Sequence, residues 1–185
     1  MLQVFFIAVG LSADTFAVSV TNGLSLNNPT KKQAFGIAAA FAFFQGIMPL
    51  FGFLLGSVFA EFIDRFAPYI ALIFLGFIGA KMIADEIMSK NEESYETLSF
   101  KTLIIQAVAT SIDALVVGVS FIAMGITGLQ ILPCIAIIGV TTFVLSFAGV
   151  DLGKRFGKLL GGRAKIVGGI ILIGIGLKVF IEGII

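Results

Sequence analysis

The sequence contains no histidine, no tryptophan and only one cysteine. The absence of histidine excludes a histidine proton relay and a histidine-rich metal site. The single cysteine, Cys134, excludes an intrachain disulfide framework, and its apolar neighbours favour a small buried residue. The sequence also lacks a Walker A motif, so any transport by this chain is expected to be secondary rather than driven by its own ATP hydrolysis.

Charged residues are scarce as well. They make up 12% of the 185 residues, whereas soluble domains carry about a quarter. Hydrophobic residues make up 58% of the chain. A chain this apolar cannot cover its surface with polar groups in water, so lipid is its expected solvent. The formal net charge of +1 indicates neither nucleic acid nor an acidic partner.

Hydrophobic runs close to the bilayer length of about 20 residues occur repeatedly along the sequence. Polar or proline-containing breaks separate them, of which the segment from Ser89 to Glu93 is the longest. The pattern predicts an all-α membrane protein with six transmembrane helices. The expected helices are 2–23, 34–60, 67–87, 100–124, 130–150 and 164–184.

Lysine and arginine are distributed unevenly among the expected loops. The odd-numbered loops hold nine of them, whereas loops 2 and 4 hold only Arg65. Cytoplasmic loops carry an excess of basic residues, so the odd loops are expected in the cytoplasm and both termini outside. The protein is therefore expected to be a multi-pass protein of the bacterial cell (inner) membrane. The nine residues are Lys31, Lys32, Lys90, Lys101, Lys154, Arg155, Lys158, Arg163 and Lys165.

The two halves of the sequence share three motifs in the same order. The offsets between matched positions are 97 to 99 residues (107 − 8 = 99; 149 − 52 = 97; 176 − 79 = 97). One match can arise by chance, but three in register indicate an internal repeat. The matched segments are Ala8–Val20 with Ala107–Val119, the glycine pair 52/56 with 149/153, and Gly-x-Lys-x-x-x-acid at 79–85 with 176–182.

The repeat predicts a domain organisation. The first three-helix repeat is expected at 1–88, a cytoplasmic linker at 89–98 and the second three-helix repeat at 99–185. Three is an odd number of crossings, so the second unit enters the membrane in the opposite direction to the first. Such inverted repeats are typical of transporters, which bind substrate near the midplane between the halves.

Asp14 and Asp113 are the strongest candidates for a functional site. Each lies near the middle of its hydrophobic run, where an aspartate costs roughly 2.5–3.5 kcal/mol on insertion scales. Helical spacing puts Thr21 on the same face as Asp14, and Thr110 and Ser120 on the same face as Asp113. The alternative is a pair of protonated aspartates hydrogen-bonded inside the bundle. Ser12 and Ser111 point elsewhere and are interpreted as helix-packing residues.

Two carboxylates with hydroxyl and amide oxygens would form a hard, oxygen-rich site. Such ligands suit Mg, Ca or Mn rather than Zn or Cu. Gln45 could add an amide oxygen and Met48 a soft sulfur, just before Pro49, which frees a backbone carbonyl. The alternatives are an interhelical hydrogen bond for Gln45 and core packing for Met48.

Two lysines are each followed four residues later by an acidic residue, a spacing at which helical side chains pair. These are Lys81 with Asp85, and Lys178 with Glu182. For the second pair we favour snorkelling toward the membrane surface. Asp85 approaches the cytoplasmic edge of its helix and is a candidate ligand at the entrance.

The chain resembles the MntP family of manganese efflux pumps, within the wider LysE exporter superfamily, over essentially its whole length. The two aspartate motifs together carry the specificity. The resemblance implies Mn²⁺ export from the cytoplasm, with Asp14 and Asp113 as binding carboxylates and Asp85 at the position of a family acidic residue. The motifs are LSADTFAVSV (Leu11–Val20), FFQGIMPLFG (Phe43–Gly52), GAKMIAD (Gly79–Asp85), ATSIDALVVGVS (Ala109–Ser120), LSFAGVDLGKRFG (Leu145–Gly157) and IVGGIILIGIG (Ile166–Gly176).

The sequence thus predicts a secondary transporter, not an enzyme, with no cofactor and with a hard divalent cation held between Asp14 and Asp113. The resemblance implies that this cation is Mn²⁺. Protons are expected to reload the carboxylates on the return stroke. The expected partners are a hard divalent cation and the lipid bilayer, and a homodimer is left open. One alternative is a LysE-like exporter of a small amino compound, and another is a membrane subunit that transports nothing.

Overall fold

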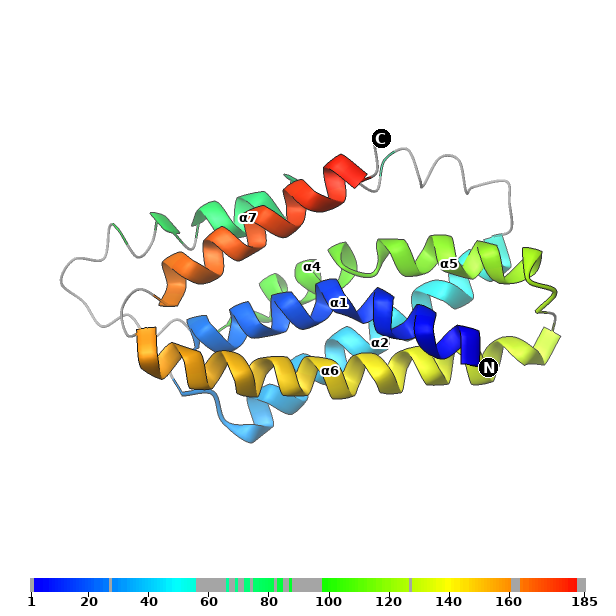
Figure 1. Cartoon of the computed structure of the whole chain (residues 1–185), viewed down its shortest axis with the longest axis horizontal. Coiled ribbons are helices and arrows are strands. Elements are labelled where there is room, and N and C mark those ends of the chain that lie inside the picture. The colour runs from blue at the N-terminus through cyan, green and yellow to red at the C-terminus, as the bar shows by residue number, and fades with distance from the viewer. Residues whose placement is uncertain are drawn as a thin grey trace.

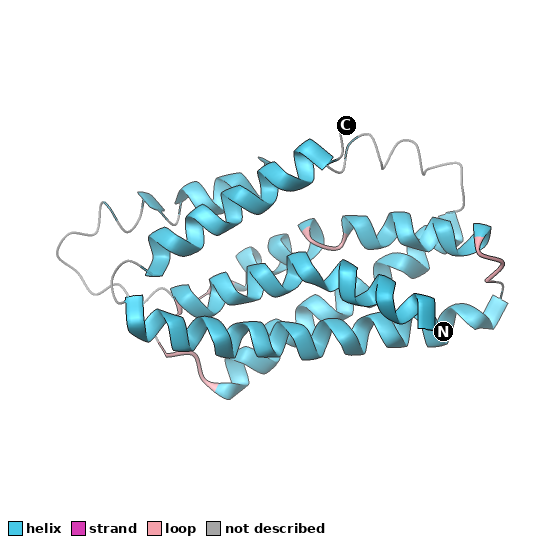
Figure 2. Cartoon of the chain, viewed as in Figure 1, coloured by secondary structure: helices cyan, strands magenta, loops and turns pink. Residues whose placement is uncertain are grey.

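A computed structural model of the chain contains only helices and connecting turns among the residues it describes (Figures 1 and 2). No described residue belongs to a strand. The described residues are 2–26, 28–55, 66, 69, 72–73, 75–81, 83–84, 87, 98–126, 128–160 and 164–182. The expected linker 89–98 therefore lies almost entirely outside the described residues.

The helices follow the hydrophobic runs of the sequence. They are α1 (Leu2–Ser25), α2 (Lys31–Leu55), α4 (Phe100–Ala109), α5 (Ile112–Ala123), the 3-10 turn η2 (Gly128–Gln130), α6 (Ile131–Leu160) and α7 (Ala164–Glu182). Residues 75–81, within the third expected helix, are helical too.

Four stretches of the described chain are long and apolar enough to cross a membrane. They are Leu2–Ser25, Lys31–Leu55, Phe100–Phe121 and Gly128–Gly157. A chain with this many spanning helices is a multi-pass membrane protein, as the sequence predicts.

The expected boundary at residue 150 is wrong, because α6 continues to Leu160. Asp151 and Arg155 form an i,i+4 ion pair of 2.9 Å along this extension. The ammonium of Lys154 donates a 2.9 Å hydrogen bond to the Pro29 carbonyl in the turn between α1 and α2. Lys154 and Arg155, expected in a loop, therefore lie on the last turns of a helix.

The expected helix 100–124 is found as one candidate membrane span, Phe100–Phe121, but it is interrupted at Thr110 and Ser111 between α4 and α5. The Thr110 hydroxyl donates to the Gln106 carbonyl at 2.9 Å, and the Ser111 hydroxyl donates to the Ala107 carbonyl at 2.6 Å. Hydroxyls that bond the preceding turn compete with the helical ladder and bend or interrupt helices. Here two such residues are adjacent.

Glycines let the helix backbones approach closely. A Cβ on Gly153 of α6 would overlap the Val20 carbonyl of α1, and a Cβ on Gly52 of α2 would overlap the Leu115 carbonyl of α5. Small residues at such interfaces allow close helix packing in membranes. Contacts of this kind hold α1 against α6 and α2 against α5.

Helix α7 packs on the α1 side of this bundle, with the segment 75–81 beside it (Figure 1). A Cβ on Gly79 would meet the Gly169 carbonyl of α7, and a Cβ on Gly169 would meet the Gly79 carbonyl. The pair therefore packs backbone to backbone, while α7 also contacts α1.

The buried apolar residues form two clusters rather than one. The first includes Val18 of α1 and Ala109 of α4, and the second includes Leu11 of α1 and Ala114 of α5. Asp14 lies between Leu11 and Val18, and Asp113 lies between Ala109 and Ala114. Both aspartates are therefore at the level where the two apolar clusters meet.

Candidate functional site between the apolar clusters

Asp113 is located at the start of the second half of the broken helix. It belongs to the first turn of α5, and its Oδ1 accepts a 2.8 Å hydrogen bond from the Ala114 amide. A carboxylate in the first turn is stabilised by the unpaired amides and by the helix dipole. The break thus provides a polar environment for a charge in the middle of an apolar span.

Asp14 and Asp113 lie on different helices, and the charge of Asp14 reaches Asp113. The side chain of Asp14 is 26% exposed, and Asp113 is an exposed residue. That the two carboxyl groups come close enough for one ion to bridge them stays a prediction.

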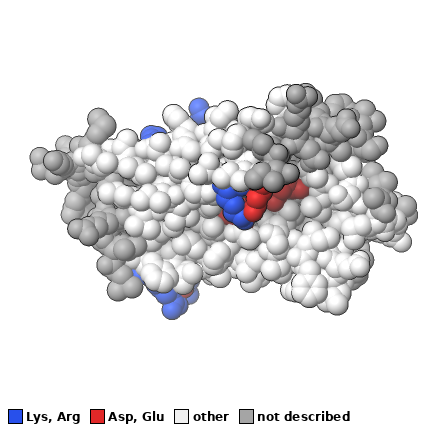
Figure 3. Space-filling model, turned by 45° about the horizontal axis from the view of Figure 1, so that its top comes forward, with Lys and Arg blue, Asp and Glu red and all other residues white. Residues whose placement is uncertain are grey.

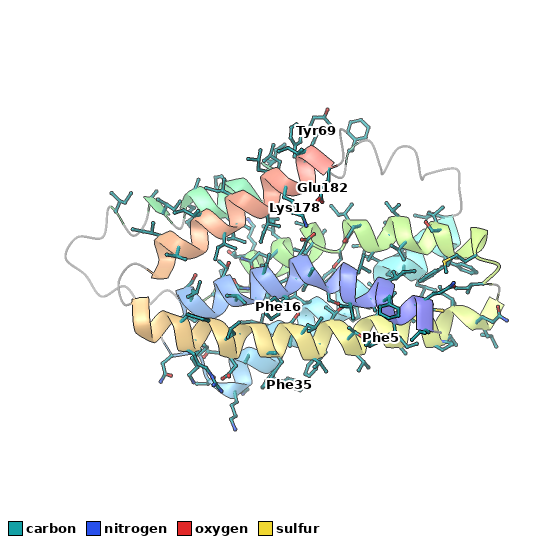
Figure 4. The ribbon with its side chains drawn as sticks, in the orientation of Figure 1. Phe5, Phe16, Phe35, Tyr69, Lys178 and Glu182 are labelled. Atoms are coloured by element: carbon teal, nitrogen blue, oxygen red, sulfur yellow. The ribbon has the colours of Figure 1, made fainter. Side chains whose placement is uncertain are left out.

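Lys178 of α7 joins this pair. Its Nζ lies 3.9 Å from Oδ1 of Asp14 and 3.8 Å from Oε2 of Glu182, one turn later on α7. Figure 4 shows Lys178 extending from α7 toward the bundle beneath it. Figure 3 shows blue and red atoms side by side near the centre of a face that is otherwise mostly uncharged among its described residues.

The expected i,i+4 pairing of Lys178 with Glu182 is confirmed, but the snorkelling interpretation overlooked the contact with Asp14. A signal was present in the sequence. The motif Gly-x-Lys-x-x-x-acid occurs once in each half. A lysine at the same place in both halves indicates a role beyond extending toward the membrane surface. Only the packing of α7 on α1 reveals its partner.

The two serines that precede the aspartates form interhelical hydrogen bonds. Ser12 and Thr142 of α6 bond through their hydroxyls at 2.9 Å, and Ser111 donates to Oε1 of Gln45 in α2 at 2.8 Å. The Ser12 hydroxyl donates to the Ala8 carbonyl at 2.6 Å and so accepts from Thr142, whereas the single proton of the Ser111 hydroxyl is shared between Gln45 and the Ala107 carbonyl, which lies at 2.6 Å. Their interpretation as packing residues is therefore confirmed.

Gln45 is fully buried, and both ends of its amide form hydrogen bonds. Its Nε2 donates to the Leu11 carbonyl at 3.1 Å, while its Oε1 accepts the bond from Ser111. The interhelical alternative for Gln45 is thus observed. Met48 packs beside the second apolar cluster, as expected of a core residue. Asp85 lies outside the described residues.

The three hydroxyl residues proposed as further ligands bond their own helices. Thr21 donates to the Ala17 carbonyl at 3.1 Å, and Ser120 donates to the Val116 carbonyl at 3.2 Å. Each is seven residues from its aspartate, which is about 10 Å along a helix. Thr110 lies at the helix break and bonds the preceding turn. Each of the three hydroxyls thus has a carbonyl partner in its own helical segment, and its role as a ligand stays a prediction.

Comparison with known proteins identifies the family. The sequence profile described as "Mntp: Putative manganese efflux pump" matches residues 28–180. The chain belongs to the Mntp family. It is 47% identical over 184 residues to the "Putative manganese efflux pump MntP" of Ruminiclostridium cellulolyticum, with 98% of this chain and 96% of that protein covered.

Other members of the Mntp family are similar along nearly their whole length. The "Putative manganese efflux pump MntP 2" of Clostridium botulinum strain Langeland is 44% identical, with 98% of this chain and 94% of the relative covered. The archaeal "Putative manganese efflux pump MntP" of Methanobrevibacter smithii is 40% identical, with coverages of 98% and 97%. No solved structure matches the chain.

In this member of the Mntp family, the site combines two carboxylates with one lysine ammonium. In the described part of the chain, no three acidic, histidine or cysteine side chains gather in a group that could hold a metal ion. Asp14 and Asp113 carry carboxylate oxygens on two different spans, and Lys178 carries a positive charge beside Asp14. Such a site can exchange one cation for another without redox or covalent chemistry.

Proposed function

We propose that this chain is a secondary transporter that exports divalent manganese from the cytoplasm, with the ion held between Asp14 and Asp113. The observation that carries the proposal is the position of two mid-span carboxylates on different helices, each between the two apolar clusters, with Asp14 in contact with the charged Lys178. The relatives named as manganese efflux pumps support the choice of manganese, since they align with 98% of this chain.

The exposure of the site supports an aqueous path rather than a packing role. Lys178 and Glu182 have side chains that are 57% and 63% exposed, and Asp113 is also exposed. A charged side chain facing hydrocarbon costs about 2.5–3.5 kcal/mol on insertion scales. Charged groups at this depth usually line a water-filled cavity or substrate path, so this exposed face is the proposed route of the ion.

The ligand chemistry supports a hard divalent cation. The two carboxylates provide oxygen, and the described part of the site has no thiolate or imidazole. Oxygen ligands suit Mg, Ca and Mn. A divalent ion also relieves the repulsion between two adjacent carboxylates, which a neutral substrate does not do.

We further propose that the two halves are inverted repeats that rock around this site. The support is a set of contacts at matching positions. Ser12 pairs with Thr142, and Ser111 pairs with Gln45. The serines are 99 residues apart (111 − 12) and their partners are 97 apart (142 − 45), which are the offsets of the sequence repeat.

The glycine contacts repeat in the same way. Gly52 abuts the Leu115 carbonyl, and Gly149 abuts the Phe16 carbonyl. The glycines are separated by 97 residues (149 − 52) and the carbonyls by 99 (115 − 16). In both cases a helix of one half contacts a helix of the other half. This is expected if one pseudo-two-fold axis relates the two halves.

The proposal includes an orientation and a return step. The nine basic residues in and beside the expected odd loops favour a cytoplasmic location for these ends of the helices and an outside location for both termini. Protons reload the carboxylates after the metal leaves, which makes the exporter a proton-coupled antiporter.

The test is Mn²⁺ flux into liposomes that contain the purified protein. The parental protein is expected to transport Mn²⁺, while Asp14→Asn and Asp113→Asn each abolish flux, because asparagine keeps the shape and removes the charge. Asp151→Asn is the control, since Asp151 pairs with Arg155 on the exposed end of α6. Parental flux in both asparagine variants would contradict the assigned site. Absence of parental flux would support a subunit that transports nothing.

A second candidate function has one specific observation in its favour. The contact between the Lys178 ammonium and Asp14 shows that the carboxylate can accept an amino group. A LysE-like exporter of a small amino compound would use the same contact with its substrate. Flux of radiolabelled basic amino acids in the same liposomes distinguishes it, and we expect none.

A further inference from the structure

Lys178 occupies an unusual position between two carboxylates. Its Nζ is 3.9 Å from Asp14 and 3.8 Å from Glu182, so it is shared almost equally. Both distances exceed the 2.7–2.9 Å of a strong charge-assisted hydrogen bond. The ammonium is therefore attracted by both acids without being fixed to either.

A metal ion at Asp14 and this ammonium exclude each other. Metal–oxygen bonds of about 2.0–2.6 Å would place a double positive charge on the carboxylate that now attracts Lys178. The two cations would then repel each other at close range. Binding of the ion therefore requires the ammonium to withdraw from Asp14.

We propose that Lys178 is an internal competitor of the transported cation at Asp14, and that Glu182 holds its ammonium while the cation is bound. This inference rests on the proposed function. Lys178 thereby controls the affinity of the site without contacting the metal, and it is a positioning and specificity residue rather than a ligand.

Glu182 is suited to this role by its place on the helix. It lies four residues after Lys178, so helix geometry keeps the two side chains together whatever happens at α1. Both side chains are more than half exposed, which leaves them room to change rotamer. The lysine can therefore leave Asp14 without becoming an unpaired charge.

The same competition favours divalent over monovalent ions. Lys178 is tethered beside Asp14, so its effective concentration there is in the millimolar range or above. A monovalent ion carries the same charge as the ammonium, so it would be attracted to Asp14 no more strongly than the tethered lysine is. A divalent ion doubles the attraction at equal distance, and under the proposed function it is also held by Asp113.

Lys178 also acts after the ion is released. Asp14 would then be an unpaired carboxylate in the middle of an apolar span, which is costly. Return of the ammonium balances this charge until a proton reloads the carboxylate, and it thereby favours release of the ion. A protein without this ammonium is expected to hold Mn²⁺ more tightly and to turn over more slowly.

The first test substitutes the lysine. We expect Lys178→Gln to bind Mn²⁺ about tenfold more tightly, equivalent to about 1.4 kcal/mol of lost competition, with a lower KM and a lower kcat for flux. Lys178→Arg keeps the charge and should restore the parental KM. Lys101→Gln, which removes an exposed lysine at the start of α4, is the control. Binding is measured from the loss of the free Mn²⁺ electron paramagnetic resonance signal, and size-exclusion chromatography verifies folding.

The second test separates Glu182 as a holder of the lysine from Glu182 as a metal ligand. Glu182→Gln should weaken Mn²⁺ binding, because the ammonium then has only Asp14 as partner. In a Lys178→Gln background the same change should have little effect. If Glu182→Gln weakens binding equally in both backgrounds, Glu182 is a ligand and the proposal is overturned.

Selectivity gives a third readout in the same assay. Potassium at a concentration that leaves parental Mn²⁺ binding unchanged should compete in Lys178→Gln. Unchanged or weaker Mn²⁺ binding by folded Lys178→Gln, in a preparation whose parental protein transports Mn²⁺, overturns the role of Lys178 and leaves the transporter assignment intact. Failure of the parental protein to bind and transport Mn²⁺ overturns both.

Discussion

Replacing Gln45 by leucine distinguishes the two roles that the sequence leaves open for this residue. Gln45 is fully buried and bridges the Leu11 carbonyl and the Ser111 hydroxyl. Side-chain hydrogen bonds between membrane helices are worth about 0.6 kcal/mol on average, so two of them add to about 1.2 kcal/mol. We expect Gln45→Leu to lower the free energy of unfolding by about 1 kcal/mol, because Ser111 keeps its 2.6 Å bond to Ala107.

The partner substitution should cost at least as much, although it removes fewer atoms. Ser111→Ala takes the hydroxyl donor away from Oε1 of Gln45, and leaving a buried acceptor unpaired costs about 1–3 kcal/mol. The double variant should lose less than the sum of the two single losses. The difference is the coupling energy, expected at about 0.6–1.7 kcal/mol.

The assay is reversible unfolding in mixed micelles with increasing sodium dodecyl sulfate, followed by far-ultraviolet circular dichroism because the chain has no tryptophan. Gln3→Leu, on the exposed start of α1, is the control and should change stability by less than about 0.5 kcal/mol. The KM for Mn²⁺ should be unchanged in Gln45→Leu. A several-fold rise in KM with unchanged stability would refute the hydrogen-bonding role and make Gln45 a metal ligand.

Three further predictions test the packing, the topology and the repeat. Gly153→Val should greatly reduce the yield of folded protein on size-exclusion chromatography, because its side chain would overlap the Val20 carbonyl, whereas Gly36→Ala should be tolerated since nothing lies within 4 Å. A reporter that is active only outside the cytoplasm should be active when fused after Ile185, and activity of a cytoplasmic reporter there would contradict the topology. An experimental structure should superpose the two halves about an axis in the membrane plane, and an axis along the membrane normal would exclude inversion.

The sequence was sufficient to predict a helical membrane protein, because the preference of a helix for lipid is a sum over many hydrophobic residues. A chain with 58% hydrophobic and 12% charged residues has helices long enough to span a bilayer, whatever their neighbours. The position of each hydrophobic run followed from composition alone. The exact ends did not, since α6 gains a further stretch from the pairing of Asp151 with Arg155 and the contact of Lys154 with Pro29.

The break before Asp113 was missed for a local reason. Threonine and serine both occur inside many continuous helices, so the hydropathy of the sequence does not mark Thr110 and Ser111 as the end of a helix. Their bonds to the Gln106 and Ala107 carbonyls form in competition with the ladder, and the Asp113 carboxylate then accepts the Ala114 amide at the new helix start. The outcome depends on three side chains acting together.

Sequence by itself determined that Asp14 and Asp113 are unusual, because a charge in the middle of an apolar run is costly wherever the helix is packed. Only the tertiary structure decided which charge meets Asp14. Lys178 is 164 residues away (178 − 14), and no helical periodicity links residues on different helices. The packing of α7 on α1 brings them to 3.9 Å, because close approach of these helices is set by side-chain shape, which is a property of the assembled bundle.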